Sequence, residues 1–159
     1  MKNKFALLLL VVSLGLFQLS AQTEFGVKGG MNFTFFKVVE NDFGANPETE
    51  IGYYGGIFVD FKIDKGFHFQ PELLYIGLND FRFINAPLYL KYDVDYNLHI
   101  LVGPSINYFP DFFNAKIKIR ADLSLAYDII PAIDVHMKYT IGFEEISPNG
   151  LFLGLGYKF

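Results

Sequence analysis

The chain has 159 residues, of which 52% are hydrophobic, 18% aromatic and 19% charged. This composition excludes a disordered chain, and the length fits one domain. A net charge of −4 argues against the basic surface that nucleic-acid binding needs. The absence of cysteine excludes disulfides, thiolate chemistry, cysteine metal sites and a cysteine-linked lipid anchor.

Residues 1–21 are predicted to be a cleavable secretory signal peptide. Two lysines lie within the first four residues, an apolar run follows at 5–17, and Ala21 is a small residue at the cleavage position. The alternative is an uncleaved membrane anchor, but the apolar run is shorter than the ~20 residues that a spanning helix needs. We therefore expect residues 22–159 to form the mature domain.

The mature region alternates apolar and polar side chains with a period of two, which is typical of strands. Residues 115–127 show this best, because Ile117 and Ile119 alternate with lysines and Arg120. Segments of this kind are found, in chain order, at 23–36, 51–63, 67–76, 81–92, 98–109, 115–127, 132–143 and 150–159. At about 3.3 Å per residue, strands of this length can cross a bilayer when tilted.

The connections between these segments are of two kinds. Turn-forming residues at 64–66, 93–97 and 128–131 predict three tight turns on one side. The connections on the other side are 37–50, 77–80, 110–114 and 144–149. If both termini lie in the periplasm, the tight turns are periplasmic and the other connections face outside.

Alternation alone leaves open which face is inside. A soluble lipocalin-like barrel encloses its apolar residues, whereas a membrane barrel exposes them. Here the charged strand residues share one face with many glycines, as a narrow lumen requires. The other face carries more bulky apolar volume than such a lumen could hold. The predicted fold class is therefore an all-β, eight-stranded antiparallel up-and-down transmembrane β-barrel.

Aromatic residues near the segment ends fit the girdles that membrane barrels place at the two interfaces. They are Phe67, Phe81, Tyr92, Tyr108, Phe109, Tyr127, Tyr157 and Phe159. Residues 108–113 also form an aromatic cluster, for which a surface that contacts a partner is the alternative interpretation. Residues 37–50 are acidic, and a solvated loop is favoured over cation or partner binding.

A polar network is predicted inside the lumen. Its members are Lys28, Asp60, Lys62, Glu72, Lys91, Lys118, Arg120, Asp122, Asp134, His136 and Lys138. We interpret it as an ion-paired plug, because eight strands leave room only for side chains. The alternative is a narrow path that conducts ions.

Two further patterns could carry chemistry. His68, His99 and His136 share the polar face and could form a three-histidine zinc site. Ser124, Asp134 and His136 share it too, and could form a hydrolytic triad. In both cases we favour hydrogen-bonded lumen residues, and we expect no metal, cofactor or catalysis.

Several motifs resemble the bacterial outer-membrane β-barrel domain family, often labelled porin family or PorT-like. They are FGVKGGMN at 25–32, FQPELLY at 69–75, PLYLKY at 87–92, Gly103-Pro104, and GLGYKF at 154–159. The resemblance implies the Gram-negative outer membrane. Gly154, Tyr157 and Phe159 resemble the C-terminal signal that the outer-membrane assembly machinery recognises, although Phe152 replaces its usual polar residue.

The expected protein is a small outer-membrane barrel with a plugged polar lumen and a non-enzymatic role in envelope integrity or surface interaction. A narrow passive porin-like pore and a lipid-modifying barrel enzyme are the alternatives. Its expected partners are outer-membrane lipid, the assembly machinery and an extracellular or envelope protein. We expect a monomer that binds no nucleic acid.

Overall fold

The computed structural model describes residues 23–36, 48–78, 82–110, 116–143 and 149–159. They form strands β1 (Thr23–Phe36), β2 (Glu48–Asp64), β3 (Phe67–Gly77), β4 (Arg82–Asp93), β5 (Leu98–Tyr108), β6 (Ile117–Ile130), β7 (Ile133–Gly142) and β8 (Asn149–Lys158). All eight predicted segments are confirmed in order, with ends that differ by a few residues. Within the described ranges, no helix has the length and apolar character to cross a membrane.

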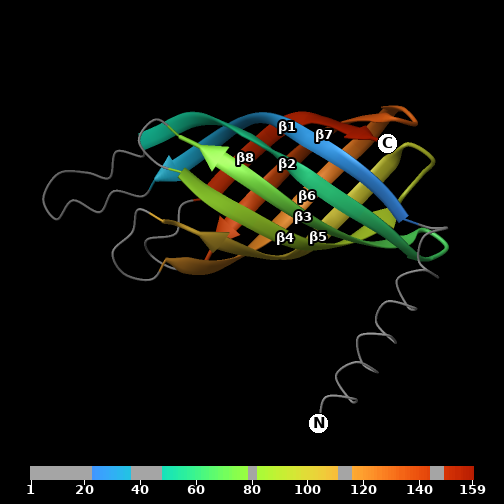
Figure 1. The fold of residues 1–159 in the computed structure, drawn as a ribbon, viewed down its shortest axis with the longest axis horizontal. Coiled ribbons are helices and arrows are strands. Elements are labelled where there is room, and N and C mark those ends of the chain that lie inside the picture. Colours follow the sequence, from blue (N-terminus) through green and yellow to red (C-terminus); the bar gives the residue numbers. More distant parts are fainter. Residues whose placement is uncertain (1–22, 37–47, 79–81, 111–115, 144–148) are drawn as a thin grey trace, which may run out of the picture.

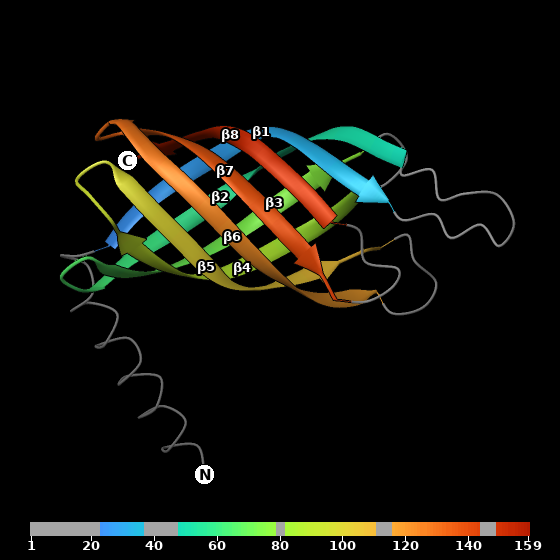
Figure 2. The same ribbon diagram turned by 180° about the vertical axis from the view of Figure 1, so that it is seen from behind.

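The strands form one closed antiparallel barrel in chain order, with β8 paired to β1 (Figures 1 and 2). Closure leaves no unpaired strand edge, so the backbone hydrogen bonds of the wall are satisfied within it. The eight-stranded all-β fold is therefore confirmed. The predicted signal peptide lies outside the described residues, as do Phe81, residues 111–113 and most of the acidic loop 37–50.

The two ends of the barrel differ. At one, which we call the turn end, tight turns join β2 to β3, β4 to β5 and β6 to β7. Gly66 has a φ of 76° in the first of these turns, a conformation that glycine adopts without strain. The C-terminus is also at this end (Figure 1), where the Phe159 amide donates to the Phe25 carbonyl at 2.9 Å. The opposite end is the far end.

The wall of the barrel exposes large apolar residues around its circumference. Tyr53 is 64% exposed, Ile119 62% and Leu155 55%, and each lies on a different strand. The charged residues alternate with these positions and point into the lumen, where most are buried. This distribution is the reverse of the one expected for the lipocalin-like alternative.

Phe109 corrects one prediction. It was expected in an interfacial girdle but is buried in the lumen, where its ring stacks on Phe83 with centroids 4.7 Å apart. Its register explains this, because Tyr108 and Phe109 must point to opposite faces of the sheet. Six other predicted girdle residues are exposed: Phe67, Tyr92, Tyr108, Tyr127, Tyr157 and Phe159.

Candidate functional site

The lumen contains most of the predicted polar residues, arranged in layers along the barrel axis. Nine of the predicted network residues are buried: Asp60, Glu72, Lys91, Lys118, Arg120, Asp122, Asp134, His136 and Lys138. The Lys28 side chain is also enclosed, with only 7% of it exposed. Lys62 departs from the prediction, because it lies at the end of β2, beside the register shift between Lys62 and Asp64, and is exposed.

At the turn end, side chains from several strands are joined in a chain of contacts that we call the turn-end ring. Its members are Asp60, His68, Lys91, Asp93, His99, Asp128 and Lys158. His68 lies between Asp60 (Nδ1–Oδ1, 2.7 Å) and Asp93 (Nε2–Oδ2, 3.1 Å). His99 lies between Asp93 (2.7 Å) and Asp128 (3.2 Å).

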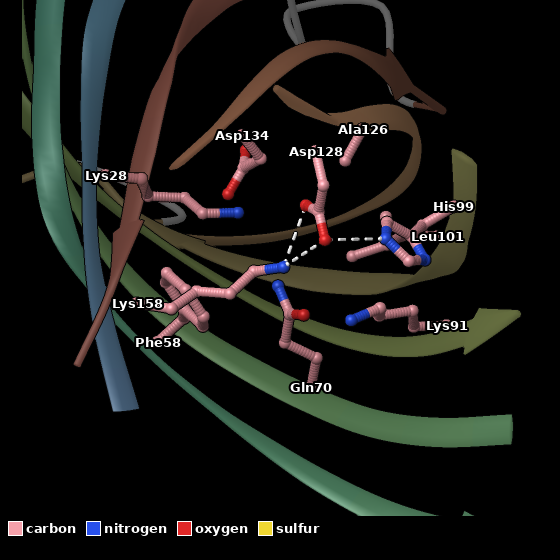
Figure 3. Close-up of a pocket in the computed structure, with 10 residues that line it drawn as sticks. All are labelled: Lys28, Phe58, Gln70, Lys91, His99, Leu101, Ala126, Asp128, Asp134 and Lys158. Atoms are coloured by element: carbon pink, nitrogen blue, oxygen red, sulfur yellow. Dashed lines mark hydrogen bonds and ion pairs between the residues drawn. The ribbon is translucent and has the colours of Figure 1, made fainter. Parts of the chain in front are cut away.

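A lysine lies at each end of the chain of contacts that forms the turn-end ring. Lys91 donates to Asp60 at 2.6 Å, and Lys158 donates to both oxygens of Asp128 at 2.8 and 2.7 Å. Figure 3 shows the contacts of Asp128 with Lys158 and His99. Sequence reasoning placed the histidines on the lumen face, but it missed this alternation of carboxylate and imidazole. The residue types on that face were the available signal.

A second network crosses the middle of the lumen. Lys28 lies 2.5 Å from Glu72, two strands away. Lys138 on β7 donates to Asn85 on β4 at 2.6 Å and lies 3.6 Å from Asp122. Contacts such as Lys138 to Asn85 join opposite sides of the wall. They therefore fill the lumen and hold the strands together.

His136 lies beside this network and makes contacts through both ring nitrogens. Its Nδ1 lies 2.8 Å from Asp134, and its Nε2 lies 2.6 Å from the Tyr54 hydroxyl. Because an ionised carboxylate only accepts hydrogen bonds, Nδ1 donates to Asp134, and in a neutral ring Nε2 then accepts from the Tyr54 hydroxyl. Ser124 instead donates to the Met137 carbonyl at 3.2 Å. The contact between His136 and Asp134 that the alternative triad would need is therefore present, but the hydrogen bond of Ser124 goes elsewhere.

The far-end cluster closes the lumen with apolar side chains. It consists of the buried residues Tyr54, Leu74, Ile76, Leu78, Phe83, Phe109 and Phe152. The Arg120 guanidinium lies 5.1 Å from the Phe109 ring centroid, and the Lys138 ammonium lies 4.1 Å from that of Phe152. Cations over ring faces link this cluster to the polar network below it. Sequence reasoning missed the cluster, although the parity of its residues placed them on the inner face.

Little free space remains in the described lumen. A cavity of about 10 Å3 between Lys28, Lys91 and Lys158 has room for about one water molecule (Figure 3). The deeper site beside Tyr54 and His136 has no room for one. Glycines permit this density, because a Cβ on Gly154 would overlap the Tyr54 hydroxyl.

The histidines do not converge on one point. His68 and His99 belong to the turn-end ring, whereas His136 bonds to Tyr54 and Asp134. Among the described residues, no group of three or more histidine or acidic side chains could hold a metal ion. The arrangement pairs charged side chains with one another and fills the described part of the lumen.

The C-terminal strand places the predicted assembly signal at the turn end. Tyr157 and Phe159 are exposed on the wall, and their rings meet edge to face with centroids 5.2 Å apart. Gly154 lies on the opposite, inner face beside Tyr54. Recognition of these residues by the assembly machinery stays a prediction.

Comparisons with known proteins support the fold. No family model matches the chain, and no curated protein matches it in sequence. Among solved structures, Ail, the attachment invasion locus protein of Yersinia pestis, aligns with 13% identity and a TM-score of 0.56 over 87% of this chain and 99% of that one. A de novo designed transmembrane β-barrel aligns with 16% identity and a TM-score of 0.54 over 86% and 93%.

Neisserial surface protein A also aligns, with 15% identity and a TM-score of 0.52 over 85% of this chain and 97% of that one. Identities this low carry the fold and no activity. The chain therefore has the fold that small, eight-stranded transmembrane barrels share.

Proposed function

We propose that the chain is a small integral outer-membrane barrel of a Gram-negative bacterium, with a plugged lumen and a non-enzymatic role in the envelope or at the cell surface. One observation carries the proposal: large apolar residues are exposed around the whole wall, while ionic residues are buried inside it. In water the exposed apolar side chains of such a wall would cause aggregation. In a bilayer they contact lipid acyl chains, which are equally apolar. The likeness to transmembrane barrels supports the same reading.

Folding in membranes tests this proposal directly. We expect residues 22–159 to refold from urea into phospholipid vesicles and to migrate faster on SDS gels unheated than after boiling. The reason is that a closed barrel stays compact in detergent until its strand pairing melts. A folded, dispersed monomer in detergent-free buffer would contradict a membrane location.

A narrow pore is the main alternative, and the filled lumen speaks against it. The far-end cluster and the crossing network leave no water-sized space beside Tyr54 and His136. We expect the purified barrel to give no channel events in planar bilayers, under conditions where a general porin conducts. Regular single-channel steps whose frequency increases with protein concentration would contradict the plugged lumen and support a pore.

A lipid-modifying enzyme is the third candidate, and the lumen gives it no support. Among the described residues Ser124 makes no hydrogen bond to a histidine, and the pocket that it lines beside His136 has no room even for a water molecule. We expect Ser124→Ala and His136→Asn to leave the lipid profile of vesicles or cells unchanged. A loss of lipid turnover in either variant would restore the catalytic hypothesis.

Several finer features belong to the same proposal. Export through the signal peptide at 1–21, assembly through the C-terminal signal and kinship with the porin or PorT-like family rest on sequence resemblance. A monomer with an extracellular or envelope protein partner is the expected working form. Labelling of intact cells that express the chain would test which end faces outside.

A further inference from the structure

Glycines on the two faces of the wall have different surroundings. On the inner face a Cβ would collide with neighbouring atoms: at Gly154 with the Tyr54 hydroxyl, and at Gly156 with the Asp134 carboxylate. On the outer face Gly77 is covered by the Tyr53 ring, which would also obstruct a Cβ. These glycines are explained by contacts within the chain, because only glycine fits there.

Gly55 is the exception. It faces outward near the middle of β2, and the nearest atom to an added Cβ would be the Lys28 carbonyl oxygen, 3.9 Å away. Its register partner on β1 is Gly29, another outward-facing glycine. No neighbour among the described residues therefore requires glycine at position 55. A glycine inside a strand often marks a place where something else approaches the backbone closely.

A hollow of about 310 Å3 lies in the outer wall over Gly55. Its floor is the backbone around Gly55, and its sides are Ile57, Leu73, Tyr75 and Ile84 from three neighbouring strands. Figure 1 shows those strands, β2, β3 and β4, side by side. The side residues are between 39% and 56% exposed, so they stand up around the floor.

The chemistry of the hollow limits what can occupy it. Gly55 pairs with Tyr75, and Tyr75 pairs with Ile84, so the backbone groups of the floor belong to the barrel's own ladder. An incoming strand would find no free edge, and a charged or polar ligand would find no partner except the Tyr75 hydroxyl. A flexible hydrocarbon chain needs only apolar contact.

We propose that this hollow is a binding groove for an acyl chain of a bilayer phospholipid, held longer than the surrounding lipids. This inference rests on the proposed membrane location, because the hollow is continuous with the apolar wall. A second copy of the chain fits the shape less well. Two copies related by a two-fold axis through the hollow would place hollow against hollow and leave a void that dense packing disfavours.

Photocrosslinking with the mature barrel in phosphatidylcholine vesicles tests the proposal. A trace of the same lipid carries a diazirine in one acyl chain, and labelled residues are located by mass spectrometry. We expect residues around the hollow to be labelled about fourfold more than outward residues on β6, since about five additional van der Waals contacts with the sides of the hollow already give a preference of that size.

Filling the hollow should abolish the preference. Gly55→Leu should reduce labelling there to the level of the rest of the wall, and Gly55→Ala should reduce it less. Ala121→Leu is the matched control, because Ala121 is a small outward residue on β6, away from the hollow. Heat-shifted mobility on SDS gels verifies folding of each variant. If Gly55→Leu does not fold, the smaller reduction in labelling expected for Gly55→Ala still tests the proposal.

The outcomes separate this inference from the function on which it rests. Even labelling around the wall, or excess labelling that survives Gly55→Leu, would overturn the groove and leave the membrane barrel intact. A dimer in detergent micelles that Gly55→Leu dissociates would assign the hollow to a second copy instead. No lipid labelling anywhere on a folded wall would reject the membrane location itself.

Discussion

The turn-end ring and the far-end cluster close the same lumen in different ways. In the ring, charged groups satisfy one another, and its central members lie near solvent: 30% of the Asp93 side chain and 15% of the His68 side chain remain exposed. In the cluster, apolar side chains are fully enclosed, with Ile76 0% and Leu74 1% exposed. Charge pairs near water are screened and contribute little each, whereas enclosed apolar groups contribute through burial and dense packing.

This difference separates two roles. The far-end cluster and the crossing network beneath it should carry most of the stability and the seal of the lumen. The ring should fix the relative positions of the strand ends at the turn end. Substitutions in each layer test this division, and they are compared by urea unfolding of barrels refolded into phospholipid vesicles.

The largest loss is expected where the crossing network meets the far-end cluster. Asp122 and Lys138 are both almost fully buried, with 0% and 4% of their side chains exposed. Asp122→Ala leaves the Lys138 ammonium without its carboxylate and should lower the free energy of unfolding by about 3–5 kcal/mol. Adding Lys138→Met should recover part of this loss, because the orphaned charge is then removed. A double variant less stable than Asp122→Ala would show that the pair is not the cause.

A somewhat smaller loss is expected inside the cluster itself. Phe152 is 2% exposed and meets the Tyr54 ring edge to face, with centroids 5.3 Å apart. Phe152→Ala should cost about 3 kcal/mol, because it leaves a cavity in a packed layer. It should also let vesicles release protons or small ions faster, whereas Phe152→Leu should remain closed. An unchanged leak rate in a folded Phe152→Ala barrel would locate the seal elsewhere.

The sequence predicted the ionic residues of the lumen better than the far-end cluster. Period-two alternation predicted the strands and most of their inward residues, so most ionic members of the lumen followed from parity. Asp93 and Asp128 of the ring were assigned to turns instead, although they belong to β4 and β6. Alternation could not identify partners such as Lys138 and Asn85, because their meeting depends on strand tilt and on the curvature of the closed wall. The far-end cluster was missed since apolar residues were assigned to the membrane by type. Phe109 shows that error, because its parity already placed it inside.

In the ring, the expected loss is smaller. Asp93 contacts both His68 and His99, so it is the shared member of the chain of contacts. Asp93→Ala should lower the free energy of unfolding by about 1–2 kcal/mol, because both imidazoles keep one other carboxylate and water reaches the site. Lys65→Ala, in the neighbouring exposed turn, is the control and should have little effect. A loss as large as that of Asp122→Ala would remove the distinction between the two layers.

The smallest effect is expected at Lys62, which marks where the ring ends. Lys62 and Lys91 were both predicted in the lumen network, but Lys62 is exposed while Lys91 is buried and donates to Asp60 at 2.6 Å. Lys62→Ala should change the free energy of unfolding by no more than about 0.5 kcal/mol, as for other surface substitutions. Lys91→Ala should cost clearly more, because it leaves Asp60 buried with only His68 as a partner. Equal losses of stability in the two lysine variants would show that the exposed Lys62 contributes as much as the buried Lys91, and that Lys62 also belongs to the ring.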